Sequence, residues 1–138
     1  MRHVLFRLSR FWAVLAGLLL LALVLGGRFC VSAVLSNIGM VKLNHSLGVS
    51  GRAASPQLLE DAERCFAHSL AWDAGNRAAH RGLGWTWEAR GELARAAREW
   101  KQGGFSAEDF LMCADRAAFV GQEDVCRLWL RRAAVMQQ

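Results

Sequence analysis

The sequence predicts an all-α protein in which one transmembrane helix precedes a short solenoid of helical hairpins. Residues 11–27, FWAVLAGLLLLALVLGG, contain no charged or strongly polar side chain. No segment of the 138-residue chain alternates apolar and polar residues as a half-buried strand does. After Pro56, the only proline, apolar residues recur at helical spacing between short turns that contain glycine or asparagine. These three observations define the expected architecture.

The uncharged run is long enough to cross a membrane. As a helix its seventeen residues extend about 25 Å, close to the hydrocarbon thickness of a bilayer. Arg10 and Arg28 bracket the run, and Phe11 with Trp12 gives one end the aromatic residues typical of interfacial anchors. We therefore expect a retained transmembrane helix at residues 11–29.

A cleaved secretory signal is the alternative for this segment. Its basic start, MRHVLFRLSR, and the sequence VSA at 31–33 would give a mature chain that begins near Val34. The apolar run is longer than most signal cores, and Arg28 followed by Phe29 is a poor approach to a cleavage site. Because basic residues are denser before the run, we expect residues 1–10 in the cytoplasm and the C-terminal part outside it.

The net charge of +5 does not indicate nucleic-acid binding. From Phe29 onward the chain has 13 Lys and Arg against 12 Asp and Glu, so the remaining excess belongs to the anchor region. A nucleic-acid interface needs a basic face on the folded part. The basicity is instead a topology signal.

Turn and capping signals place the remaining helices. The helical pattern continues after the anchor until GVSGRAASP, so residues 30–55 are expected to form a juxtamembrane helix and a linker. Ser55 before Pro56 marks a helix start, and Ser106 with Asp109 forms the pattern of a capping box. Short links require consecutive helices to pack as antiparallel neighbours. The expected helices span 56–72, 77–89, 92–102, 106–120 and 123–136.

An internal period of 34 residues runs through these helices. Ala62-x3-Phe66 recurs as Ala96-x3-Trp100, and His80-x2-Leu83-Gly84-x2-Trp87 stands between them. This succession resembles the tetratricopeptide repeat. A weaker third copy reads Phe110-x2-Cys113-Ala114-x2-Ala117, followed by Cys126-x3-Leu130.

The resemblance implies two to three repeats over residues 56–138, and the helix before GVSGRAASP would be the first helix of the earliest repeat. Gly84 and Ala96 would be small where the helices of a hairpin cross, while Trp87 and Trp100 would fill the neighbouring spaces. Such packing would offset the roughly 1 kcal/mol that glycine costs inside a helix. The expected repeat core is Ala62, Phe66, Leu83, Gly84, Trp87, Ala96, Trp100 and Leu130.

The resemblance also implies a concave surface lined by the first helix of each repeat. That surface would carry Arg81, Trp85 and Glu88, and in the third copy Asp115 and Phe119. A tryptophan between an arginine and a glutamate suits a partner peptide or helix. The alternative is that Trp85 packs against a neighbouring helix.

The last helix is expected to expose an apolar end. Trp129, Leu130 and Val135 lie there with no further helix to cover them, so this end is expected to dock onto a partner or to bury itself in the groove. On the same helix, Arg127, Arg131 and Arg132 either meet lipid headgroups or an acidic partner or remain solvated.

No catalytic or cofactor motif is evident. The four cysteines have no metal-binding spacing and are expected in helix interfaces, with Cys113 and Cys126 the only pair placed to form a disulfide. No histidine is joined by a motif to a nucleophile, and His80 is expected at a helix interface. We therefore expect no enzyme, no metal, no cofactor and no small-molecule substrate.

The sequence thus favours a single-pass membrane adaptor or assembly scaffold with a protein partner in a membrane or envelope complex. Two alternatives remain. The chain could be a permanent accessory subunit of a multi-subunit membrane complex, or a cleaved, soluble periplasmic binding module. Stoichiometric copurification and a mature N-terminus near Val34, respectively, would distinguish them.

Overall fold

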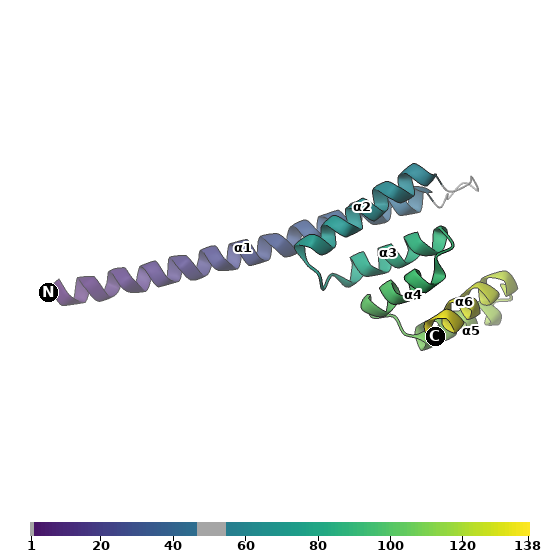
Figure 1. Cartoon of the computed structure of the whole chain (residues 1–138). Coiled ribbons are helices and arrows are strands. Elements are labelled where there is room, and N and C mark those ends of the chain that lie inside the picture. Colours follow the sequence, from purple (N-terminus) through teal and green to yellow (C-terminus); the bar gives the residue numbers. More distant parts are fainter. Residues whose placement is uncertain (1, 47–54) are drawn as a thin grey trace.

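The computed structural model describes residues 2–46 and 55–138, with side chains from residue 16 onward except residue 25. These parts form six α-helices and contain no strand (Figure 1). The predicted all-α class is confirmed, and the five helices after residue 55 lie within one residue of their expected bounds. The helices are α1 Arg2–Ser46, α2 Pro56–Trp72, α3 Arg77–Ala89, α4 Leu93–Gln102, α5 Ala107–Phe119 and α6 Glu123–Met136.

The local stop and start signals act as the sequence predicts. Gly91, Gly104 and Gly121 follow α3, α4 and α5 with φ of 81°, 80° and 73°, a conformation that costs glycine little. At the start of α5 the Ser106 and Asp109 side chains each accept a hydrogen bond from the other residue's backbone N–H, which completes the capping box. These signals act within a single turn of helix and involve no tertiary contact.

α1 is a single helix of 45 residues, and its N-terminal half projects away from the other helices (Figure 1). Leucine side chains such as Leu18, Leu20 and Leu23 are exposed there. Within the described residues it is the one helix long and apolar enough to cross a membrane, with a mean hydropathy of 2.3 in its apolar window. The helix runs on past Arg28 without a break, whereas most of the expected linker lies outside the described residues.

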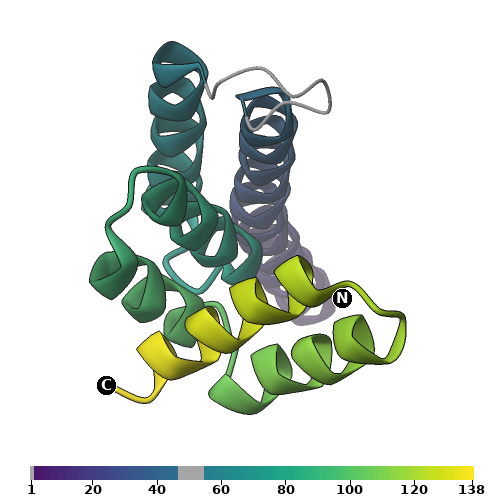
Figure 2. The same ribbon diagram turned by 90° about the vertical axis from the view of Figure 1, so that its right-hand side faces the viewer.

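The C-terminal half of α1 packs antiparallel against α2 (Figures 1 and 2). The α1 side of this seam is buried and mostly small, and its residues recur every three or four positions. Gly39 is required there because a Cβ at this position would lie 2.7 Å from the Phe66 ring. Residues 30–46, expected as part of a juxtamembrane segment, therefore form one arm of the α1–α2 hairpin. The seam on α1 comprises Ser32, Ser36, Gly39, Leu43 and Ser46.

The two glycines inside α3 lie where large aromatic side chains press against the helix. A Cβ on Gly82 would lie 2.2 Å from the Phe66 ring, and a Cβ on Gly84 would lie 2.2 Å from Trp100 Cδ1. Phe66 and Trp100 are both fully buried. Close packing of α2 and α4 on α3 thus offsets the helix cost of these glycines.

The third hairpin, α5 and α6, packs differently from the first two. It crosses the direction of α1 and α2, and α6 rather than α5 approaches α4 (Figure 2). Trp129, Ala133 and Met136 form the inner face of α6. Leu130 is one residue further along the helix than Trp129, so it turns away by about 100°.

The expected repeat core is therefore corrected at one position. Leu130 is 45% exposed and lies outside the core. The other seven residues expected in the core are buried. The cysteines differ from expectation in their exposure, because Cys30 and Cys113 are exposed rather than packed in helix interfaces. All four cysteines are free, Cys113 and Cys126 included.

Candidate partner-binding groove

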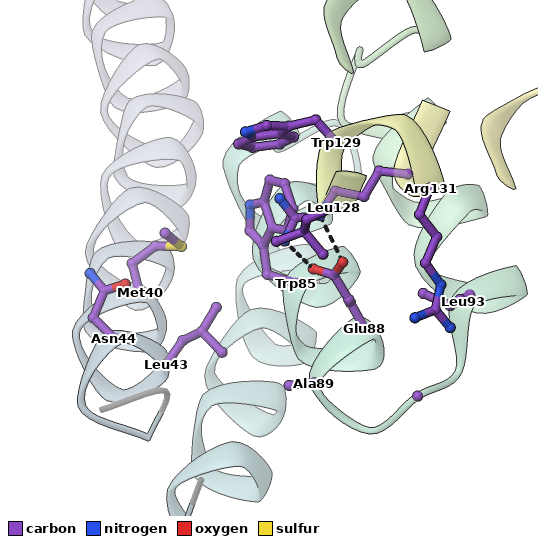
Figure 3. A pocket seen from close by; sticks show the side chains of 12 residues that line it. Met40, Leu43, Asn44, Trp85, Glu88, Ala89, Leu93, Leu128, Trp129 and Arg131 are labelled. Carbon is purple, nitrogen blue, oxygen red and sulfur yellow. Dashed lines mark hydrogen bonds and ion pairs between the residues drawn. The ribbon is translucent and has the colours of Figure 1, made fainter. Parts of the chain in front are cut away.

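A cavity of about 610 Å³ lies between the C-terminal end of α1, α3 and α6 (Figure 3). This volume is in the usual range of ligand pockets, roughly 300–1,000 Å³, so the cavity holds a few side chains rather than a whole helix. We call it the groove. Its lining comprises Met40, Leu43 and Asn44 of α1; Trp85, Glu88 and Ala89 of α3; Gly91 and Leu93 near the α3–α4 turn; and Leu128, Trp129, Arg131 and Arg132 of α6.

An ion pair between α3 and α6 forms one wall of the groove. Arg132 donates from Nε and Nη2 to the two carboxylate oxygens of Glu88, at 2.7 and 2.8 Å. The Arg132 guanidinium also lies 4.8 Å from the ring centroid of Trp85 and 4.3 Å from that of Trp129. Bidentate geometry and two aromatic faces hold this arginine in one orientation.

Behind this wall, aromatic side chains join the third hairpin to the rest of the fold. Trp85 lies 4.8 Å from Trp100 and 6.2 Å from both Phe110 and Trp129, measured between ring centroids. Phe110 and Trp129 stack at 5.8 Å. Trp85 therefore packs against neighbouring helices and also presents part of its surface to the groove.

The groove combines apolar surface with one cation that has no counter-ion. Glu88, its only carboxylate, is already neutralised by Arg132. Arg131 is exposed and has no ion pair among the described residues. Met40, Leu43, Leu93 and Leu128 supply apolar surface, as Figure 3 shows for the side chains that converge from α1 and α6. The local charge thus favours an apolar ligand that bears an acidic group.

The structure brings together only some of the predicted site residues. Trp85 and Glu88 line the groove. Arg81 does not, because its Nε donates to the Gly103 carbonyl at 2.7 Å and its guanidinium lies 4.6 Å from the centroid of the Phe105 ring. Asp115 and Phe119, on α5, are exposed and do not line it either.

α6 occupies the place that the repeat pattern assigned to α5. The Leu128–Arg132 stretch was therefore missed as a lining segment, although its aromatic and basic residues were noted. The contribution of α1 was missed because Met40 and Leu43 belong to a segment interpreted as juxtamembrane. The repeat pattern made this segment the first helix of the earliest repeat, but none of its residues was expected on the binding surface.

The remaining polar side chains act within the fold. His80 contacts Glu99 through Nδ1 at 2.8 Å and the Ala74 carbonyl through Nε2 at 3.1 Å, which is the role expected of an interface histidine. The Lys42 ammonium, 3.0 Å from Asp61, lowers the pKa of that carboxyl below its ordinary value. Hydrogen bonds from the Ser106 backbone and hydroxyl lower the pKa of Asp109 in the same way.

Within the described residues no cluster of three or more His, Cys, Asp or Glu could hold a metal ion. The arrangement offers shape, apolar surface and a guanidinium, which are means of binding. No protein-family model, curated protein or solved structure matches this chain.

Proposed function

We propose that the protein is a membrane-anchored adaptor that holds a segment of a partner protein in the groove. The observation that carries the proposal is that one helix, α1, contains the apolar span and also supplies Met40 and Leu43 to the groove wall. A ligand in the groove would therefore contact the anchor helix itself. Anchoring of this kind raises the effective concentration of a bound partner near the membrane.

The proposed partner segment is a short apolar stretch that carries at least one Asp or Glu. The apolar lining accounts for the first property, and the unpaired guanidinium of Arg131 accounts for the second. The groove lies at some distance from the bilayer, because Met40 is about 18 Å along α1 from Arg28. The partner segment would thus be bound outside the membrane.

Retention of the anchor is part of the proposal. Cleavage near Val34 would remove Ser32, whose fully buried hydroxyl lies 2.8 Å from Ser69 Oγ on α2. A cleaved chain would lose this link and the start of the α1–α2 seam. The excess of basic residues before the span supports a cytoplasmic N-terminus and an extracytoplasmic helical domain.

We further propose that the α1–α2 and α3–α4 hairpins form a short array of the tetratricopeptide kind. Two hairpins stacked through α2 and α3, and glycines under buried aromatic rings, support this likeness. The α5–α6 hairpin departs from a regular array because it approaches α4 through α6. This departure lets α6 form a wall of the groove.

A second candidate function is favoured by the free face of α1. Val34, Ile38 and Val41 are exposed and lie on the side of the helix opposite the α2 seam. If the chain were a permanent accessory subunit of a membrane complex, a neighbouring subunit would cover this stripe. The chain would also copurify with its complex in a fixed ratio, whereas an adaptor would exchange partners.

The test of the adaptor proposal is site-specific photo-crosslinking in native membranes. A crosslinker at position 128, in the groove, is compared with one at position 130, on the same helix but outside it. The two native leucines are 42% and 45% exposed, so they form a matched pair. We expect a crosslinked peptide that is apolar and contains Asp or Glu from position 128 only.

The variants Leu128→Asp and Arg131→Glu should abolish copurification of that partner, while Leu130→Asp should leave it unchanged. A partner held equally by all three variants would overturn the assignment of the groove. A partner that copurifies in a fixed ratio and crosslinks through position 38 instead would favour the accessory-subunit candidate.

A further inference from the structure

We propose that the α2–α3 turn rests in the lipid interface of the membrane that α1 crosses, with Trp72 as a second anchor. This inference rests on the proposed membrane anchoring of α1, and it is independent of the groove and its partner. It assigns a function to an exposed aromatic residue that the groove does not use.

Trp72 lies beside the residues at which the apolar run ends. It is the last residue of α2 and is 47% exposed. A shallow hollow of about 290 Å³ is shared by Trp72, the α2–α3 turn, Arg28 and Phe29. Arg28 is the first charged residue after the uncharged run, and Phe29 is exposed. Figure 1 shows this turn beside the middle of α1, where the free N-terminal half begins.

Buried hydrogen bonds hold the α2–α3 turn against the part of α1 that follows Arg28. Ser69 Oγ donates to the Ser32 carbonyl at 2.8 Å, and Ser32 Oγ donates to the Ser69 carbonyl at 3.0 Å. Asn76 Nδ2, on the far side of the turn, donates to Ser32 Oγ at 2.7 Å. Ser32 is about 6 Å along α1 from Arg28. Trp72 therefore cannot move away from α1 unless this network breaks.

The chemistry of this end fits a lipid interface. Tryptophan prefers the headgroup region because its ring is apolar while its N–H finds polar partners there. Arg28 and Arg77 carry positive charge here, and the Asp73 carboxylate accepts a hydrogen bond from the Gly75 backbone N–H at 3.0 Å. Because the net charge of these three residues is only +1, the attraction comes mainly from the indole and a zwitterionic bilayer suffices.

A lipid surface is favoured over a protein partner because Trp72 lies beside Arg28 and Phe29, where the apolar run of α1 ends. α1 brings the residues around Arg28 to the bilayer boundary, and the serine network places Trp72 at the same height. The turn would also limit rocking of the helical domain, which would otherwise depend on α1 alone.

Tryptophan quenching by brominated lipids in reconstituted vesicles tests the proposal. The full chain carries Trp12→Phe, which removes the other tryptophan expected at an interface. It is placed in zwitterionic vesicles with bromine atoms near the headgroup or near the bilayer centre. We expect shallow bromine to quench the parent, and a further Trp72→Phe or Trp72→Leu substitution to reduce that quenching several-fold.

A Trp129→Phe substitution in the same parent is the matched control. Trp129 is a half-buried tryptophan beside the groove, so its removal should leave the quenching unchanged. Equal quenching with and without Trp72, in variants whose circular dichroism matches the parent, would overturn the inference. If the parent fails to float with the vesicles, both the anchoring and this inference fail. Flotation without Trp72-dependent quenching refutes the inference alone.

Discussion

Arg132 of α6 and Glu88 of α3, 44 residues apart, form a two-hydrogen-bond ion pair between helices that share no close backbone contact in the described structure. The two side chains are 13% and 18% exposed, so solvent screens the pair only in part. Because the pair spans the groove wall, it helps to set the distance between α3 and α6. The geometry of the proposed binding site thus depends on this ion pair together with the contacts of Trp85 with Phe110 and Trp129.

Replacement of this arginine should destabilise the fold measurably. Arg132→Met removes two charge-assisted hydrogen bonds and leaves Glu88 without its partner, so we expect a loss of about 2 kcal/mol in the free energy of unfolding. The control is Arg127→Met, because Arg127 is 72% exposed and its ion pairs lie within α6. That change should cost less than about 0.5 kcal/mol. Equal thermal midpoints for the two variants, followed by circular dichroism, would contradict the prediction.

The close contact between Gly84 of α3 and Trp100 of α4 leads to a second prediction. Gly84→Ala adds a methyl group 2.2 Å from Trp100 Cδ1 and 2.3 Å from Nε1, and the fully buried indole has no free space to enter. Overpacking costs about 1–3 kcal/mol, which exceeds the roughly 1 kcal/mol that alanine gains in a helix.

We therefore expect Gly84→Ala to lower the thermal midpoint. Gly26→Ala is the control, because Gly26 is also inside a helix and a Cβ there would meet nothing within 4 Å. Gly26→Ala should leave the midpoint unchanged or raise it. An unchanged midpoint for Gly84→Ala would mean that Trp100 can shift and that the contact is not tight.

Local sequence signals account for how well the helices could be predicted. The Ser106–Asp109 capping box and the glycines after α3, α4 and α5 act over one turn, so the sequence alone reveals their effect. Close packing on α3 was also foreseeable from Gly84. The expected neighbour was the small Ala96, whereas the atoms nearest to Gly84 belong to the Trp100 indole.

The groove could not be predicted in the same way. Its shape depends on the angle of the third hairpin, which is held by long-range contacts such as the Glu88–Arg132 ion pair, across 44 residues. Alignment of the third copy by residue type assigned Leu130 to the core, whereas α6 turns Trp129 and Ala133 inward. The α1 wall was missed because residues 30–55 were interpreted as a juxtamembrane helix and linker, so Met40 and Leu43 were not expected on a binding surface.

The hydrogen-bond network around Ser32 and Ser69, between α1 and α2, should stabilise the fold more than one isolated buried hydroxyl does. Ser69→Ala removes a hydroxyl that bonds Ser32 and Asn76, and it leaves the buried Ser36 hydroxyl without a partner among the described residues. We expect a cost of about 1–2 kcal/mol in the free energy of unfolding. Ser46→Ala is the matched control, because Ser46 is a buried serine on the same seam whose hydroxyl, among the described residues, donates only to the Leu43 carbonyl. Equal costs for the two variants would show that the network has no special effect.

Acidification should weaken the α1–α2 hairpin through Asp61. The hydrogen bond and charge of Lys42, reinforced by Arg64, lower the pKa of Asp61 in the folded chain below the ordinary value of 3.8 that applies on unfolding. As the pH falls through 3.8, the unfolded chain takes up a proton first, so the stabilisation present at neutral pH is lost towards the folded pKa. Asp61→Asn removes this contribution, and its thermal midpoint should therefore decline less steeply with acid than that of the wild type.

The pKa of Asp109 is also lowered in the folded chain, so the thermal midpoint of the wild type falls with acid for two reasons. Only the difference between the wild-type and Asp61→Asn curves therefore reports on Asp61. Asp115→Asn serves as the control, because Asp115 is exposed and has no ion pair among the described residues. Its curve should follow the wild type at every pH. If the Asp61→Asn curve also runs parallel to the wild type below pH 4, Lys42 does not stabilise the ionised carboxylate in the folded chain. The hairpin would then depend on the small-residue seam and the serine network alone.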